Sequence, residues 1–162
     1  ELRSVSRSDG KWDIHNYALG SEEQLAMINH SKNSYSSSIL EMEEKHLEVA
    51  PESQVIDQVE VQVRPLDDIL LDLRNIQNEV FLKIDTQGYE KQVLDGAKGS
   101  LDRIRGVQME MSLLPLYKSE ALFTDLILHM SELGYELYQL IPGLVNNQNG
   151  RLLQVDGIFF KT

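Results

Sequence analysis

The chain has 162 residues, of which 41% are hydrophobic and 25% charged, a composition typical of one globular domain with a substantial core. Its net charge of −11 argues against binding to nucleic acid or to an anionic membrane, because both need a basic protein surface. The lack of cysteine excludes a disulfide framework, and no apolar run approaches the roughly 20 residues of a membrane span, so we expect a cytoplasmic protein.

The N-terminal third predicts short strands and a loop. Residues 1–5 read as the end of a helix without an initiator Met, so we expect the chain to be part of a longer polypeptide. Residues 11–19 and 24–29 predict two strands around a turn at 20–23, an arrangement compatible with a hairpin. The Ser-rich segment 30–38 predicts a loop, and we expect its serines to be solvated rather than to line a binding pocket.

The next segments are either highly charged or alternate between apolar and polar residues. Residues 41–48 form a charged segment of doubtful helicity. Valine alternates with polar residues at 59–63, which predicts a half-exposed strand that Pro65 ends. Asp67 is placed to cap a short helix that extends through Leu73.

An apolar run at residues 80–84 is rich in strand formers and predicts a strand buried on both faces. It ends at Asp85, a turn follows at 86–88, and residues 89–105 carry apolar side chains at helical spacing. This order places a functional side chain at the carboxyl edge of an open α/β sheet, where the ligands of such sheets bind. Asp85 is therefore the predicted centre of the functional site.

Another strand and a loop are predicted next. Gly106 is expected to break the chain, and residues 107–111 form a strand in which Glu110 is the polar exception. A buried carboxylate needs a partner, so Glu110 is either paired in a salt bridge or faces the crevice of the site. Residues 113–117 contain proline and predict a loop.

The C-terminal segments complete an alternating pattern. Residues 120–133 carry an apolar stripe and predict a helix that Gly134 ends. Residues 135–141 and 152–160 predict strands that form a hairpin around an Asn-Gly step. Strand–helix alternation implies parallel strands with right-handed crossovers, and the closing hairpin adds an antiparallel strand.

Four motifs, taken together and in order, resemble those of the FkbM-type methyltransferases, which use S-adenosylmethionine. The motifs are NYALG at residues 16–20, SYSSSIL at 34–40, RPLDDI at 64–69, and KIDTQGYE at 83–90 with VLDGA after it at 93–97. The resemblance implies an α/β, Rossmann-like methyltransferase fold whose sheet is mostly parallel with a C-terminal antiparallel hairpin. It also implies methyl transfer from S-adenosylmethionine to a hydroxyl of a sugar or secondary-metabolite-like small molecule.

Two features depart from the family pattern. The family usually has Glu where this chain has Gln87, which removes one carboxylate from the turn and weakens a metal-site interpretation. The Gly-rich loop after the first strand and the acidic residue that holds the cofactor ribose are both absent. We therefore expect residues 1–162 to be the C-terminal portion of a single methyltransferase domain, whose missing strands leave edges that the rest of the polypeptide or oligomerisation would cover.

The predicted catalytic residues are Asp85, Glu90 and Glu110. Asp85 would accept or orient the proton of an acceptor hydroxyl, unless it only caps the following helix or ties down the turn. Glu90 has a role in the site, or its carboxylate only follows the preference of a first helical turn for negative charge. The resemblance implies that the cofactor is bound by Asn16, Ala18, Leu19, Asp85, Gln87 and Gly88. No metal site is predicted because the four histidines lack ligand spacing, and His30 is the only one considered as a base.

Two other interpretations remain open. A non-catalytic α/β interaction module fits the absent Gly-rich loop and the glutamine at position 87. A metal-dependent enzyme using Asp85, Glu90 and Glu110 predicts loss of activity on chelation. The expected partners are a small-molecule acceptor and a second copy of the chain.

Overall fold

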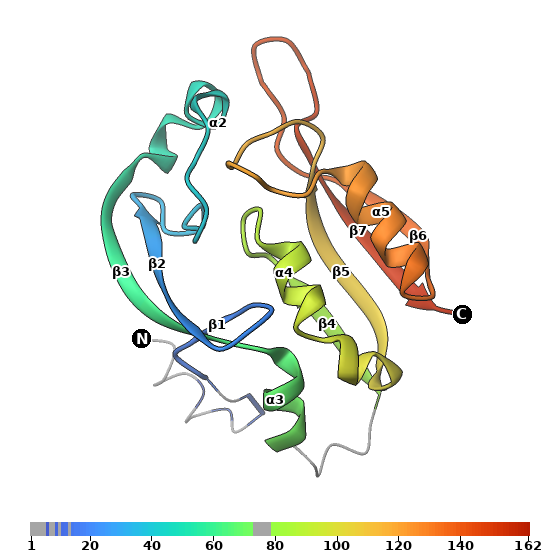
Figure 1. Ribbon diagram of the computed structural model, residues 1–162. Coiled ribbons are helices and arrows are strands. Elements are labelled where there is room, and N and C mark those ends of the chain that lie inside the picture. Colours follow the sequence, from blue (N-terminus) through green and yellow to red (C-terminus); the bar gives the residue numbers. More distant parts are fainter. Residues whose placement is uncertain (1–5, 7–8, 10, 13, 73–78) are drawn as a thin grey trace.

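The computed structural model describes residues 6, 9, 11, 12, 14–72 and 79–162 (Figure 1). These residues form two β-sheets, with strand orders β1-β3-β2 and β4-β5-β7-β6. The predicted helix end at 1–5 and the predicted helix terminus at Leu73 lie outside the described residues. In the described part of the chain, no helix combines the length and the apolarity that a membrane crossing requires.

The first sheet consists of β1 (Ala18–Leu19), β2 (Gln24–Ser31) and β3 (Val55–Arg64). β1 pairs with β3 in parallel, and β2 pairs with β3 antiparallel. The prediction of a hairpin between 11–19 and 24–29 is therefore wrong, because both segments pair with β3 instead of with each other. The first predicted strand also shortens to two residues, after which the Gly20 N–H donates to Arg64 O at 3.1 Å.

The second sheet consists of β4 (Val80–Ile84), β5 (Ile104–Ser112), β6 (Tyr135–Pro142) and β7 (Gln154–Lys161). β4 and β5 are parallel, whereas β5–β7 and β6–β7 are antiparallel. The C-terminal hairpin is thus confirmed as the β6–β7 pair. Both sheets are mixed, rather than one sheet that is mostly parallel.

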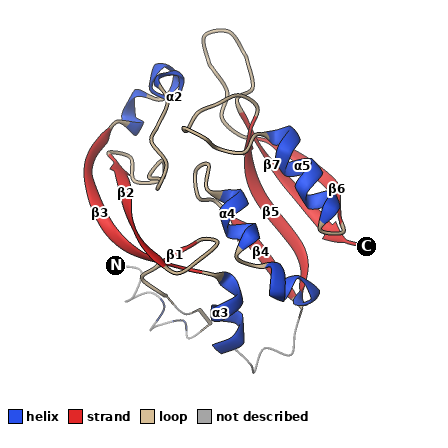
Figure 2. Ribbon diagram, in the orientation of Figure 1, coloured by secondary structure: helices blue, strands red, loops and turns tan. Residues whose placement is uncertain are grey.

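Four α-helices accompany the sheets in the described residues: α2 (Glu44–Val49), α3 (Leu66–Asp72), α4 (Glu90–Asp95) and α5 (Phe123–Glu132). Short 3₁₀ helices occur at Pro51–Ser53 and Lys98–Arg103. α4 and α5 lie on the same face of the second sheet (Figure 2), and the main hydrophobic core fills the space between them and the strands. The core includes Ile84, Val93, Leu94, Val107, Met109, Leu126, Met130 and Phe159.

The opposite face of the second sheet carries exposed aromatic side chains. Phe81 is 52% exposed and contacts Phe160, which in turn contacts Tyr138. The prediction that residues 80–84 are buried on both faces is therefore wrong. Burial alternates along β4 because it is an edge strand whose other face no described helix covers.

The helix predicted at 89–105 is shorter in the structure, where α4 ends at Asp95. The next residue, Gly96, lies so close to the backbone of Gly20 that an added Cβ would be 1.9 Å from the Gly20 carbonyl oxygen, so this position has no room for a side chain. The chain then continues as a 3₁₀ helix and enters β5 at Ile104. Gly106 lies inside β5 and does not break it; the rings of Phe81 and Phe160 cover the space that its side chain would occupy.

Asp67 has a different role from the predicted one. α3 begins at Leu66, so Asp67 lies within its first turn rather than before it. Its Oδ2 accepts a hydrogen bond of 2.8 Å from the Gly99 N–H, which ties α3 to the 3₁₀ helix that precedes β5.

Candidate functional site

The turn after β4 is built by two consecutive residues with left-handed backbone. Asp85 directly follows β4, Gln87 has φ 55° and Gly88 has φ 95°, and α4 begins at Glu90. Gly88 has little space for a side chain, because an added Cβ would lie 3.0 Å from Cβ of Tyr117. The predicted order of strand, carboxylate, turn and helix is confirmed, and it directs Asp85 to the carboxyl edge of β4.

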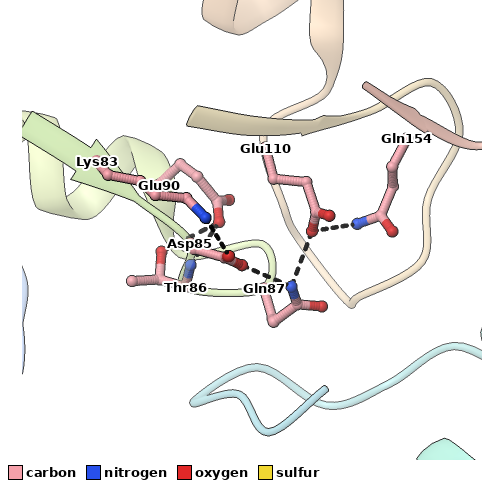
Figure 3. Close-up of polar contacts among 7 residues, drawn as sticks. All are labelled: Lys83, Asp85, Thr86, Gln87, Glu90, Glu110 and Gln154. Carbon is pink, nitrogen blue, oxygen red and sulfur yellow. Dashed lines mark hydrogen bonds and ion pairs between the residues drawn. The ribbon is translucent and has the colours of Figure 1, made fainter. Parts of the chain in front are cut away.

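Glu90 holds this turn in place. Its Oε1 accepts hydrogen bonds from Thr86 N and Thr86 Oγ1, each at 3.1 Å (Figure 3). A third hydrogen bond comes from Gly88 N at 3.2 Å. The residue is only 3% exposed, and burial raises the pKa of its carboxyl above the usual value. The carboxylate of Glu90 thus serves the backbone of the turn.

Replacing Glu90 by glutamine should change the free energy of unfolding by less than about 1 kcal/mol, because the amide oxygen can accept the same hydrogen bonds. Glu90→Ala should cost about 2–3 kcal/mol, since it leaves buried turn donors unpaired. Chemical denaturation of both variants measures the two values. A catalytic role for the Glu90 charge predicts a different result, namely that Glu90→Gln loses activity at unchanged stability.

Gln87 connects the groups of the site. Its Nε2 donates to Asp85 Oδ1 at 3.0 Å and to Glu110 Oε2 at 2.8 Å (Figure 3). Its Oε1 accepts from the Tyr117 hydroxyl at 2.8 Å. Its backbone oxygen accepts from Ser38 Oγ at 2.7 Å. One neutral amide therefore bridges two carboxylates and donates a hydrogen bond to each.

Asp85 does not cap α4. Its Oδ1 accepts from Gln87, and its Oδ2 pairs with Lys83 Nζ at 3.1 Å. The side chain is 47% exposed, which leaves it open to a ligand. The interpretation of Asp85 as a helix cap is therefore wrong.

Glu110 lies on β5 and faces a cavity, and amides rather than a cation hold it. Gln87 Nε2 and Gln154 Nε2 both donate to its Oε2, each at 2.8 Å, so neither amide occupies Oε1. Burial raises the pKa of Glu110 to about 7, and the nearby charges of Asp85, Glu90 and Asp156 act in the same direction. Near neutral pH this carboxyl is poised to take or release a proton.

Two cavities meet at Asp85. The first, here called the polar cavity, has a volume of about 330 Å³ and is lined by Asn33, Tyr35, Ser36, His46, Ala50, Glu52, Ser53, Asp85, Gln87, Glu110, Gly143, Leu144 and Gln154. The second, here called the small cavity, has a volume of about 160 Å³ and is lined by Ala18, Leu19, Ile28, Ser37, Ser38, Ile39, Asp85, Thr86 and Tyr89. Asp85 belongs to both linings, and the remaining residues come from segments far apart in the sequence.

The residues expected to bind a cofactor are distributed over this region. Ala18 and Leu19 line the small cavity with Asp85, and Gln87 lines the polar cavity. Gly88 is buried within the turn, and Asn16 is exposed and belongs to neither lining. Among the described residues, no group of three or more His, Asp or Glu side chains is arranged to hold a metal ion.

The Ser-rich loop is packed rather than solvated. Ser36 and Ser38 are buried; Ser36 Oγ lies 3.0 Å from Ser53 Oγ, and Ser38 Oγ donates to the backbone of Gln87. Partners from other segments satisfy these hydroxyls, so the expectation of a solvated loop is wrong for both residues. A Ser-rich composition carries no signal for such partners.

His46 and Tyr117 are site residues that the sequence did not reveal. His46 is 2% exposed, lines the polar cavity and contacts the Tyr117 ring edge-on, with ring centroids 5.2 Å apart. It lies in a charged segment whose pattern is uninformative. His30, the histidine considered as a base, instead pairs with Asp57 on the surface at 2.8 Å and lines neither cavity.

Comparison with protein-family models matches residues 3–137 to the domain described as "Methyltransferase FkbM domain". No curated protein and no solved structure gives a significant match to the chain.

Proposed function

The chain belongs to the FkbM methyltransferase domain family, and from this membership we propose that it transfers a methyl group from S-adenosylmethionine to a hydroxyl of a small-molecule acceptor. The observation that carries the proposal is that Asp85 lines both the small cavity and the polar cavity. Methyl transfer is an in-line displacement, so the donor and the acceptor must meet at one point from opposite sides. Two cavities that share one lining residue are compatible with such a meeting point, and this supports the proposal.

The small cavity suits one part of the cofactor. Ala18, Leu19, Ile28 and Ile39 give it apolar walls, and the Ser37 and Ser38 residues add hydroxyl groups. Mostly apolar walls with a few polar groups are typical of cofactor sites, although about 160 Å³ accommodates only a portion of such a ligand. When bound, S-adenosylmethionine supplies an electrophilic methyl group.

Glu110 is the proposed general base. A base works best when its pKa lies near the working pH, and the pKa of Glu110 is about 7. Its Oε2 is held by the two glutamine amides, which leaves Oε1 to receive the proton of the acceptor hydroxyl. The Gln87 and Gln154 amides hold this carboxylate in position beside the cavity.

The acceptor in the proposal comes from the family resemblance, and its other finer parts come from the composition and motifs of the sequence. We propose a sugar or secondary-metabolite-like acceptor, cytoplasmic location, and a chain that forms the C-terminal portion of one methyltransferase domain. The Rossmann-like character of that domain is supported by the parallel β4–β5 pair with α4 between its strands in the chain.

Calorimetric titration with S-adenosylhomocysteine tests the proposal. The wild-type chain should bind the ligand, and Asp85→Ala should weaken binding by about tenfold or more, because Asp85 lines the cofactor cavity. Asp102→Ala is the matched control, since Asp102 is fully exposed and pairs only with Lys161.

The absence of binding to the wild-type chain would contradict the proposal that this chain is itself an enzyme. It would favour the non-catalytic interaction module, for which Asp85→Ala leaves association unchanged. Loss of wild-type activity on chelation would instead favour the metal-dependent alternative.

A further inference from the structure

The polar cavity is acidic. Glu52, Asp85 and Glu110 contribute carboxylates to it, and no Lys or Arg is among the described residues that line it. Lys83 pairs with Asp85 but is itself half exposed and is not part of the lining. A ligand that carries a carboxylate or a phosphate would bring like charges together here, and that is unfavourable at short range.

One wall of the same cavity is built from uncharged hydroxyl and amide groups that bind one another. Asn33 Nδ2 donates to Ser36 Oγ and to Ser53 Oγ, each at 3.0 Å, and this cross-linking holds one wall rigid. Tyr35 also lines the cavity and is 74% exposed, so its ring is free to stack on the apolar face of a ligand ring.

His46 is the member of this lining that lacks a partner. Its Nδ1 is buried and has no hydrogen bond, although buried polar atoms nearly always have one. Burial lowers the pKa of His46, so the ring is neutral at pH 7. A neutral imidazole carries one donor and one acceptor and exerts no net attraction on an anion, which matches a ligand hydroxyl.

We propose that the polar cavity binds an uncharged, hydroxyl-bearing ring, that His46 Nδ1 forms a hydrogen bond with one of its hydroxyls, and that the acidic lining rejects carboxylate and phosphate ligands. The assignment of this ring to the methyl acceptor rests on the proposed function. His46 is then a binding residue that selects the acceptor, distinct from Glu110, which takes the proton.

The test is an NMR titration in which the histidine rings of the protein carry the isotope label and sugars are added as ligands. The probes are methyl glucoside and methyl galactoside, each compared with the corresponding uronate, which carries a carboxylate in place of the C6 hydroxymethyl group. The neutral sugars should shift the His46 ring signals saturably, and the uronates should bind about tenfold more weakly or not at all. His46→Ala should weaken neutral-sugar binding by about tenfold, the loss expected from one hydrogen bond, whereas the exposed His15→Ala should not.

The inference is overturned if neither neutral sugar shifts the His46 signals, or if the uronates bind as well as the neutral sugars. The wild-type titration decides this even if His46→Ala fails to fold. Titration of the same sample with S-adenosylhomocysteine separates the two proposals. Cofactor binding without a sugar response rejects the acceptor site alone, whereas a sugar response without cofactor binding rejects methyl transfer and retains the cavity as a neutral-ligand site.

Discussion

The Glu110→Gln variant is expected to lose methyl transfer by about 10²- to 10⁴-fold, the contribution typical of a positioned general base. Glutamine has nearly the same shape, and its amide oxygen can accept from Gln87 and Gln154 as Oε2 of Glu110 does. Binding of S-adenosylhomocysteine should therefore be unchanged. Single-turnover rates with a saturating acceptor measure the loss, and Glu136→Gln, an exposed glutamate on β6, is the matched control.

The pH dependence of activity provides a second test of Glu110 as the general base. A general base is active when deprotonated, so wild-type activity should rise with pH and level off above about 7, the pKa of Glu110. Glu110→Gln should lose this rise in its residual activity. An unchanged pH profile in the variant would assign the proton transfer to another group.

The free energy of unfolding should fall as pH rises, whereas activity should rise. The pKa of Glu110 is raised from 4.5 to about 7 in the folded chain, so its contribution to stability is fully present below pH 4.5 and is lost as pH rises through 7. At about 1.4 kcal/mol per pKa unit, this amounts to about 3 kcal/mol. Relative to wild type, Glu110→Gln should therefore be more stable at pH 8 than at pH 5.

The Gln87→Glu variant is expected to lose several kcal/mol of folding stability at pH 8 and much less at pH 5. The substitution replaces the amide that donates to Asp85 and to Glu110 with a third carboxylate. Two unit charges 4 Å apart repel by about 4 kcal/mol at an effective dielectric of 20, and two such pairs are created. Below neutral pH, protonation of one member of the cluster relieves the repulsion.

Urea denaturation at pH 5 and pH 8 measures this difference. Gln139→Glu is the matched control, because Gln139 is exposed on β6 and its replacement creates no carboxylate cluster. An equal loss of stability at both pH values would show that the shape of the Gln87 side chain, and not its neutral amide, is what the site requires.

The sequence predicted the local structure around Asp85 correctly, because its signal lies within one segment. One short segment contains a run of strand formers, a carboxylate, a glycine that adopts positive φ and the start of a helix. This order places Asp85 at the carboxyl edge of β4. The β6–β7 hairpin and α5 followed from equally local patterns. Glu110 was identified because a carboxylate in an apolar strand needs a partner.

Only the tertiary structure decided which segments meet around that centre. Tyr117 reaches Ser36 across 81 positions of sequence and His46 joins the same cavity, yet neither residue stands out in its own segment. The pairing of β1 and β2 with β3, and the need for glycine at position 96, likewise depend on contacts with distant segments. Sequence periodicity reports which face of an element is buried. The partner of that face is determined by long-range packing and hydrogen bonding, for which a single sequence contains no local pattern.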